Sequence, residues 1–239
     1  GLLRVLRLGN NFLSGVLPEL LGCPLLEWLG VASNRLHGPI PRWAHLKRLR
    51  ILVLSENNFS GNFPDVSAWP AMEDFEAGTA PLSGTLPQLD SLVNLTRFRV
   101  GFTAVGGSMP CFGNLRKLRV FRVRSSAVSG DIPPGCLPSS IQNLYLNDNQ
   151  FNGSLAFLQN LTSLRVVHVS GNRWGGSLPA TLPATLESFV GRNCSWSGPI
   201  PRAWADAPNL REIDLSVNNI SLPLPAMLSL QYLILTGNP

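Results

Sequence analysis

Three stretches at the start of the chain repeat one phrase: LRVLRLGNNFLSGVLP (Leu3–Pro18), LEWLGVASNRLHGPIP (Leu26–Pro41) and LRILVLSENNFSGNFP (Leu49–Pro64). The phrase runs on through ten copies and a partial eleventh, whose starts are 23 residues apart seven times and then 22, 24 and 20 apart. Self-similarity at such a period predicts a solenoid. The copies begin at Leu3, Leu26, Leu49, Met72, Leu95, Leu118, Ile141, Leu164, Leu186, Leu210 and Leu230.

Within each copy the segment LxLxx alternates apolar and polar residues, which predicts a short strand with its leucines turned inward. One strand per coil should stack in parallel on its neighbours, about 4.8 Å apart, because no coil can bury its apolar face alone. We therefore predict a mainly β repeat solenoid, a single domain over residues 1–239. It should be a curved right-handed superhelix with a parallel concave sheet and an irregular or 3-10 convex side. A further apolar column should fill the convex wall: Leu46, Trp69, Leu92, Leu115 and Leu161.

An asparagine follows most of the predicted strands, and its amide is expected to satisfy backbone groups of the turn. Ala80, Thr103 and Ser126 interrupt this column. We expect the coils over residues 72–140 to be locally irregular, as a specialised binding region or by divergence without function. The column consists of Asn11, Asn34, Asn57, Asn149, Asn172, Asn218 and Asn238.

The composition limits the classes of protein to consider. Charged residues make up 14% of the chain, and the net charge of +5 comes from dispersed Lys and Arg residues, so no nucleic-acid partner is expected. No apolar segment approaches the roughly 18 residues that cross a bilayer, so a membrane connection would need segments outside this chain. The chain begins and ends within a coil and lacks terminal caps, so it is interpreted as a fragment.

The tail of the phrase resembles that of plant-specific extracellular leucine-rich repeats, in which LSGxIP follows the asparagine. NFLSGVLP, NNFSGNFP, AVSGDIP and CSWSGPIP carry this resemblance, although the plant repeat is usually one residue longer. TAPLSGTLP (Thr79–Pro87) and Thr103 resemble instead the repeats of kinetoplastid surface antigens. The resemblance implies an extracellular or cell-surface glycoprotein that binds a protein, peptide or glycan ligand on its concave face.

Three functions follow from this resemblance and remain open. The first is the ectodomain of a receptor-like kinase or receptor-like protein in signalling. The second is a secreted enzyme inhibitor of the polygalacturonase-inhibitor type, and the third a cell-surface adhesion antigen.

The repeat register gives each cysteine a place. Cys23 falls in the convex apolar column and Cys194 in the asparagine column, so both are expected to be buried and, at roughly 33 Å apart, unable to pair. Cys111 and Cys136 lie on the outer side of adjacent coils, where they form either a disulfide or two free thiols. With no CxxC and no His/Cys cluster, we expect neither a metal site nor a cofactor.

Six asparagines head N-x-S/T triplets, which are acceptors for N-glycosylation. Their number favours a secretory route, although some of the triplets arise from the repeat itself. The candidates are Asn58, Asn94, Asn152, Asn160, Asn193 and Asn219.

Residues between the inward leucines project from the concave face, where Glu76 should face Arg99 and Asp74 should face Arg97. Arg122 and Arg124 have no acidic partner in their columns. Because arginine binds carboxylate and phosphate in forked geometry, we predict that they form, with Tyr145 and His168, the centre of a site for an acidic group. The alternative is a solvated strand face with mobile arginines. The candidate ligand-binding residues are Arg97, Arg99, Phe102, Arg122, Arg124, Tyr145, His168 and Trp28.

Nothing in the sequence predicts an enzyme. His37, His45 and His168 fall in three different columns, and no carboxylate in the columns of His168 and Ser170 could orient that imidazole. No phosphate loop or nucleophile motif occurs. We expect no catalytic residues.

Overall fold

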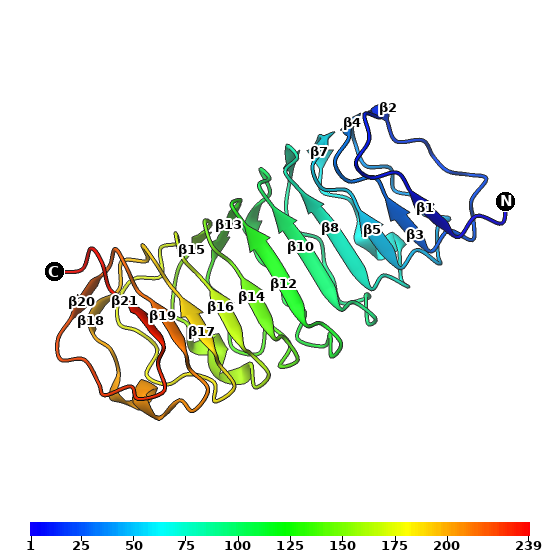
Figure 1. Cartoon of the computed structure of the whole chain (residues 1–239). Coiled ribbons are helices and arrows are strands. Elements are labelled where there is room, and N and C mark those ends of the chain that lie inside the picture. Colours follow the sequence, from blue (N-terminus) through cyan, green and yellow to red (C-terminus); the bar gives the residue numbers. More distant parts are fainter.

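The computed structural model describes residues 1–239 as a stack of coils joined by one continuous parallel sheet (Figure 1). Each strand of this sheet begins two residues after the predicted start of a repeat, which confirms the solenoid fold. In sheet order the strands are β1 (Val5–Arg7), β3 (Trp28–Gly30), β5 (Ile51–Val53), β8 (Asp74–Gly78), β10 (Arg97–Gly101), β12 (Val120–Arg124), β14 (Asn143–Tyr145), β16 (Val166–His168), β17 (Ser188–Val190), β19 (Glu212–Asp214) and β21 (Tyr232–Ile234).

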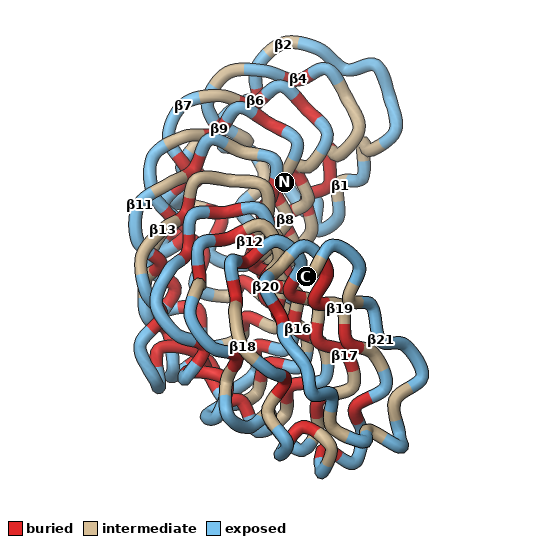
Figure 2. Tube along the Cα trace, turned by 90° about the vertical axis from the view of Figure 1, so that its left-hand side faces the viewer, coloured by how far each residue is buried: buried red, intermediate tan, exposed pale blue.

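The inward residues of successive strands form one core. Leu6 pairs in register with Leu29, and Leu29 with Leu52. Farther along, Phe98 stacks on Phe121 at 5.6 Å between ring centroids. Burying each such side chain stabilises the stack by about 1.5–3 kcal/mol, and Figure 2 shows that buried segments recur in coil after coil. The predicted convex column is buried as well: Leu46, Trp69, Leu92, Leu115 and Leu161 are 0% exposed.

Short second strands line one flank of the stack, after the turns that end most of the main strands (Figure 1). Three 3-10 turns, η1 (Val66–Ala68), η2 (Ala156–Asn160) and η3 (Arg202–Asp206), are the helical segments, and none could span a membrane. The flanking strands are β2 (Ser14–Val16), β4 (Arg35–Gly38), β6 (Asn58–Phe59), β7 (Gly61–Asn62), β9 (Leu82–Ser83), β11 (Gly106–Ser108), β13 (Ala127–Gly130), β15 (Gln150–Phe151), β18 (Ser197–Pro199) and β20 (Asn219–Ser221).

The asparagine column satisfies backbone groups of its own turn, as predicted, and also bonds the preceding coil. The Asn172 Nδ2 atom donates to the carbonyl oxygen of Leu146 in the preceding coil and of Val169 in its own, each at 2.9 Å. Its Oδ1 atom accepts from the backbone N–H of Phe151 at 3.0 Å. Cys194 replaces an asparagine and donates its thiol to Val169 O at 3.4 Å. Burial raises the pKa of this thiol to about 12, so it remains a protonated donor.

The expectation of irregular coils over residues 72–140 is wrong. Strands β8, β10 and β12 in these coils are five residues long and regular, whereas the other strands of the main sheet have three. Elsewhere the asparagine amide bonds the carbonyl groups that follow the strand and turns the chain away. In the three long-strand coils no side-chain amide bonds these carbonyl groups: Ala80 has no polar group, and Ser126 donates only its hydroxyl, to Arg124 O at 3.1 Å. The strands there continue for two more residues.

The cysteines differ from expectation in one respect. Cys194 is buried, but Cys23 is only half-buried, because it lies in the first coil and packs against a neighbour on one side only. Cys111 and Cys136 are joined on the outer side of adjacent coils, with their Cα atoms 4.4 Å apart.

Candidate functional site

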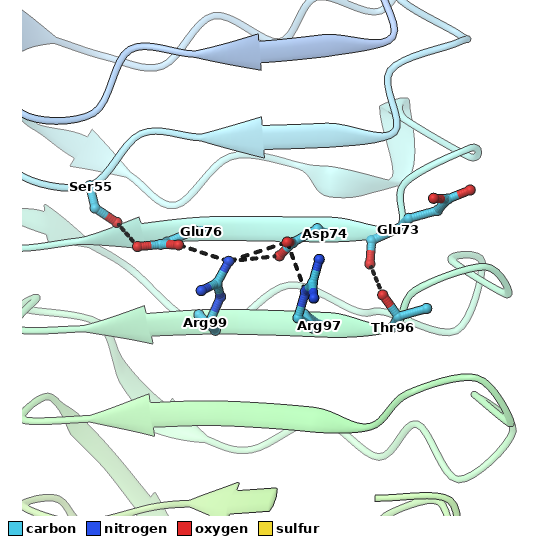
Figure 3. Close-up of polar contacts among 7 residues, drawn as sticks. All are labelled: Ser55, Glu73, Asp74, Glu76, Thr96, Arg97 and Arg99. Atoms are coloured by element: carbon cyan, nitrogen blue, oxygen red, sulfur yellow. Dashed lines mark hydrogen bonds and ion pairs between the residues drawn. The ribbon is translucent and has the colours of Figure 1, made fainter. Parts of the chain in front are cut away.

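The long strands β8 and β10 carry a cluster of compensating charges on the concave face (Figure 3). The buried Asp74 carboxylate bonds Arg97 Nε at 2.9 Å and Arg99 Nη2 at 3.2 Å. Arg99 Nη2 also lies 2.9 Å from Glu76 Oε2. The predicted pairs are therefore confirmed, with Asp74 shared between two arginines, and the cluster holds Arg99 in a fixed position.

Arg122, on the next strand, has no such partner. It is in register with Arg99 on one side and Tyr145 on the other, and its Cζ atom lies 4.5 Å from the centre of the tyrosine ring. Arg124 lies in the same way over the exposed ring of Phe102, at 4.8 Å. No carboxylate lies within 4.0 Å of either guanidinium group.

The same place on the sheet also holds two buried hydrogen-bond donors without an acceptor. The Nε atoms of Arg99 and Arg122 are buried and lack a hydrogen-bond partner. Unsatisfied buried donors are uncommon in native proteins, and each costs about 1–3 kcal/mol. Unpaired positive charge and unused donors thus meet on one part of the concave sheet.

A pocket of about 130 Å³ opens at this place. Its floor is Gly78 and Gly101, whose φ angles are negative, so neither glycine is required by the backbone conformation. A Cβ atom at Gly101 would lie 2.8 Å from Arg124 Cγ, so the missing side chain leaves room for the stem of that arginine. The other residues of the pocket are Ser55, Glu56, Glu76, Ala77, Thr79, Arg99, Val100, Phe102, Arg122 and Arg124.

Tyr145 and His168 extend the site along the sheet. Their rings meet edge to face, with centroids 5.0 Å apart. Burial lowers the pKa of His168 below its ordinary value, and the charge of Arg122 lowers it further, whereas Glu212 and Asp214 act in the opposite direction. The imidazole is therefore neutral at neutral pH, and it continues the aromatic surface that begins at Tyr145.

Two candidate residues lie apart from this group. Arg97 is held by Asp74 and does not line the pocket. Trp28 lies on β3, three strands before β10, with its ring over Gly30 and the Arg7 Cζ atom 4.8 Å from its centre.

Sequence reasoning missed Glu56, Gly78 and Thr79 as pocket residues. A signal was present for two of them, because Glu56 and Thr79 lie 46 and 23 residues before Phe102, in the same column of the repeat. Glu56, Thr79 and Phe102 adopt a left-handed backbone, with φ between 55° and 58°, at the edge of the concave sheet.

The other two histidines lie away from the pocket. His45 Nε2 lies 3.2 Å from the Leu20 carbonyl oxygen, and His37 lies on the flank in β4. No three His, Cys, Asp or Glu side chains are grouped so that they could hold a metal ion.

The six candidate glycosylation sites lie on several surfaces. Asn58 and Asn219 are in flanking strands and Asn152 directly follows one. Asn160 is the last residue of η2 on the convex side, and Asn193 precedes the buried Cys194. Asn94 is half-buried and accepts a bond from Lys117 Nζ at 2.7 Å; the other five are exposed.

Comparison with known proteins agrees with the repeat. The Leucine Rich Repeat family model matches residues 2–23, 48–68 and 209–230. Receptor-like protein 36 of Arabidopsis thaliana is 40% identical over 77 residues, which make up 31% of this chain and 11% of that protein. The matched part is thus about a tenth of that relative's length.

Solved structures match over nearly the whole chain. The plant peptide hormone receptor RGFR1, in complex with RGF2, superposes with a TM-score of 0.84 at 26% identity, covering 99% of this chain and 44% of that one. The ectodomain of the membrane receptor kinase GASSHO1/SCHENGEN3 from Arabidopsis thaliana, in complex with CASPARIAN STRIP INTEGRITY FACTOR 2, gives 0.75 at 27% identity, covering 99% and 33%. In both cases the chain spans less than half of the similar protein.

Proposed function

We propose that this solenoid, whose repeats are similar to those of plant receptor-like proteins, is a non-catalytic recognition module from a cell-surface receptor-like protein. Its ligand is an extended peptide, or a peptide segment of a protein, that carries an acidic group. The ligand lies on the concave face and places that group at Arg122 and Arg124. The chain belongs to the extracellular part of the protein.

The pair of arginines without acidic partners carries this proposal. An unpaired guanidinium beside another cation is destabilising on a sheet, so the arrangement is best explained by a negative charge supplied from outside. Arg122 and Arg124 each present a fork of donors that matches a carboxylate or phosphate. The charge of Arg99, in contrast, is already neutralised by Asp74 and Glu76.

The surroundings lower the cost of binding. Each free guanidinium group rests on an aromatic face, Arg122 on Tyr145 and Arg124 on Phe102, so fewer side-chain conformations are lost when a ligand binds. Gly101 leaves room for the stem of Arg124 to lie against the sheet, and Tyr145 and His168 offer the ligand an apolar surface.

The test uses an array of synthetic 12-residue peptides in matched acidic and amide versions, Asp against Asn and Glu against Gln. The chain should prefer the acidic member of its binding pairs by about tenfold or more, since each ionic hydrogen bond contributes about 1.5–3 kcal/mol. The double variant Arg122→Ala/Arg124→Ala should lose that preference.

The control is Arg173→Ala/Arg202→Ala, which removes the same charge from exposed positions outside the concave face. It should bind as the unchanged chain does. An array on which no acidic peptide is preferred, or a preference that survives in Arg122→Ala/Arg124→Ala, contradicts the proposed site.

A further inference from the structure

A second hollow lies on the convex side, away from the ligand site. Its volume is about 350 Å³, and it opens between two adjacent coils. Gln159 and Thr162 line it from one coil, and the segment 181–185 lines it from the next. Since liquid water occupies about 30 Å³ per molecule, this space corresponds to about twelve waters and is large enough for one sugar ring.

The hollow exists because one coil is shorter on its convex side. The coils before and after it carry the 3-10 turns η2 and η3, whereas the segment 181–185 forms no helix. Pro183 takes the place in the convex column that Leu161 fills one coil earlier, and it is followed by the small Ala184. The wall of the solenoid therefore recedes between the two turns.

Bonds on both sides keep this segment from collapsing into the hollow. Thr185 Oγ1 donates to Leu164 O at 2.7 Å and to Thr162 O at 3.2 Å. From the following coil, Trp204 Nε1 donates to Pro179 O at 2.8 Å and Asn209 Nδ2 donates to Ala184 O at 2.9 Å. The hollow is thus a fixed feature of the coil stack.

The triplet Asn160–Leu161–Thr162 lies at the edge of the hollow. Asn160 is exposed at the end of η2, and residues on both sides of it, Gln159 and Thr162, line the hollow. Any sugar attached to the Asn160 amide nitrogen would therefore begin at the rim.

We propose that Asn160 carries an N-linked glycan and that the first sugar of this glycan packs into the convex hollow, joining the two coils. A sugar ring has apolar faces and a rim of hydroxyl groups. The hollow offers both kinds of partner, with Leu182 and Pro183 for the ring and Gln159, Thr162 and Thr181 for the hydroxyl groups. This function is structural and independent of ligand binding on the concave face.

Asn152 provides a matched comparison. It heads the triplet Asn152–Gly153–Ser154 and is equally exposed, but neither it nor its neighbours line this hollow. A glycan there should project into solvent.

The experiment uses the chain secreted from a eukaryotic host, with the occupancy of each site measured by mass spectrometry. Asn160→Gln should lower the Tm of the glycosylated protein by about 2–4 °C, whereas Asn152→Gln should change it by less than about 1 °C. Enzymatic removal of the glycans should lower the Tm of the unchanged chain and abolish its difference from Asn160→Gln.

Hydrogen exchange gives a second, local measurement. The glycan should slow amide exchange in the segment 181–185, and this protection should be lost in Asn160→Gln but not in Asn152→Gln. An unoccupied Asn160 overturns the proposal. The proposal is also overturned if Asn160 is glycosylated but Asn160→Gln changes neither the Tm nor the rate of amide hydrogen exchange in the segment 181–185.

Discussion

The Arg122 guanidinium group lies 4.5 Å from the ring centre of Tyr145 on one side. On the other side, Arg122 is in register with Arg99 of the adjacent parallel strand, which carries the same charge. Attraction to the ring contributes about 0.5–1 kcal/mol, and repulsion by Arg99 is no larger, because Asp74 and Glu76 compensate most of the charge of Arg99. Arg122 therefore contributes little to folding, although it occupies the centre of the concave sheet.

From this balance we expect Arg122→Gln to change the free energy of unfolding by less than about 1 kcal/mol. Urea denaturation at low and high salt checks this, and the unchanged chain should gain more stability from salt than the variant does. A loss of more than about 2 kcal/mol would identify Arg122 as a structural residue and weaken its proposed role in binding.

Asp74 should behave in the opposite way. Its side chain is only 7% exposed and bonds both Arg97 and Arg99, so Asp74→Ala should cost about 2–3 kcal/mol of unfolding free energy. Glu27→Ala is the control, because Glu27 pairs with the exposed Arg4 and should cost less than about 1 kcal/mol. Equal losses in the two variants would contradict the role given to the buried carboxylate.

The asparagine column offers a test of how coils are joined. Asn172→Ala removes four bonds to backbone groups and should destabilise the chain by about 3 kcal/mol. Thr103→Ala, where the column is interrupted, removes a bond to Ser126 Oγ and should cost about 1 kcal/mol. Thermal unfolding of both variants compares them directly, and a larger loss for Thr103→Ala would show that the interrupted coils rely on their hydroxyl groups.

The fold could be predicted because each position of the repeat has one dominant physical demand. Leu29 and Phe98 must be buried in the core for the coils to stack, whatever ligand the protein binds. Counting in steps of 23 residues was therefore sufficient to place them. The charge pairs of Asp74 and Glu76 followed from the same register.

The features that could not be predicted lie in coils that depart from the average repeat. The longer strands occur where Thr103 and Ser126 bond through hydroxyl groups in place of the asparagine amide. The average repeat does not show how the backbone continues after that replacement. The place of Glu56 in the pocket depends on a left-handed turn, and the convex hollow depends on a wall that recedes at Pro183. These are properties of particular coils, which the average repeat does not describe.

His168 gives the chain a pH-dependent stability. Its pKa is lowered in the folded state, so as pH falls below about 6.5 the unfolded state takes up a proton that the folded state resists. Stability should therefore fall from about pH 6.5 downward until the folded-state pKa is passed. His168→Gln should lack this component.

The check is the difference in unfolding free energy between the unchanged chain and His168→Gln, measured from pH 8 to pH 4. We expect it to be constant above about pH 7 and to shift in favour of the variant at lower pH. His37→Gln, which removes an imidazole from the flank, is the control. A difference that does not vary with pH would contradict the account of His168.

Steric closure of the concave face tests the central claim most directly. His168→Asn creates a glycosylation triplet with Val169 and Ser170, and a glycan there would project from the concave sheet beside Tyr145. The matched control, His168→Asn/Ser170→Ala, carries the same change at position 168 without the triplet. With occupancy checked by mass spectrometry, the glycosylated variant should lose binding of the acidic array peptides. The control, which loses the imidazole surface but carries no glycan, should still bind them measurably. Full binding by the glycosylated variant would show that the ligand does not lie on the concave face.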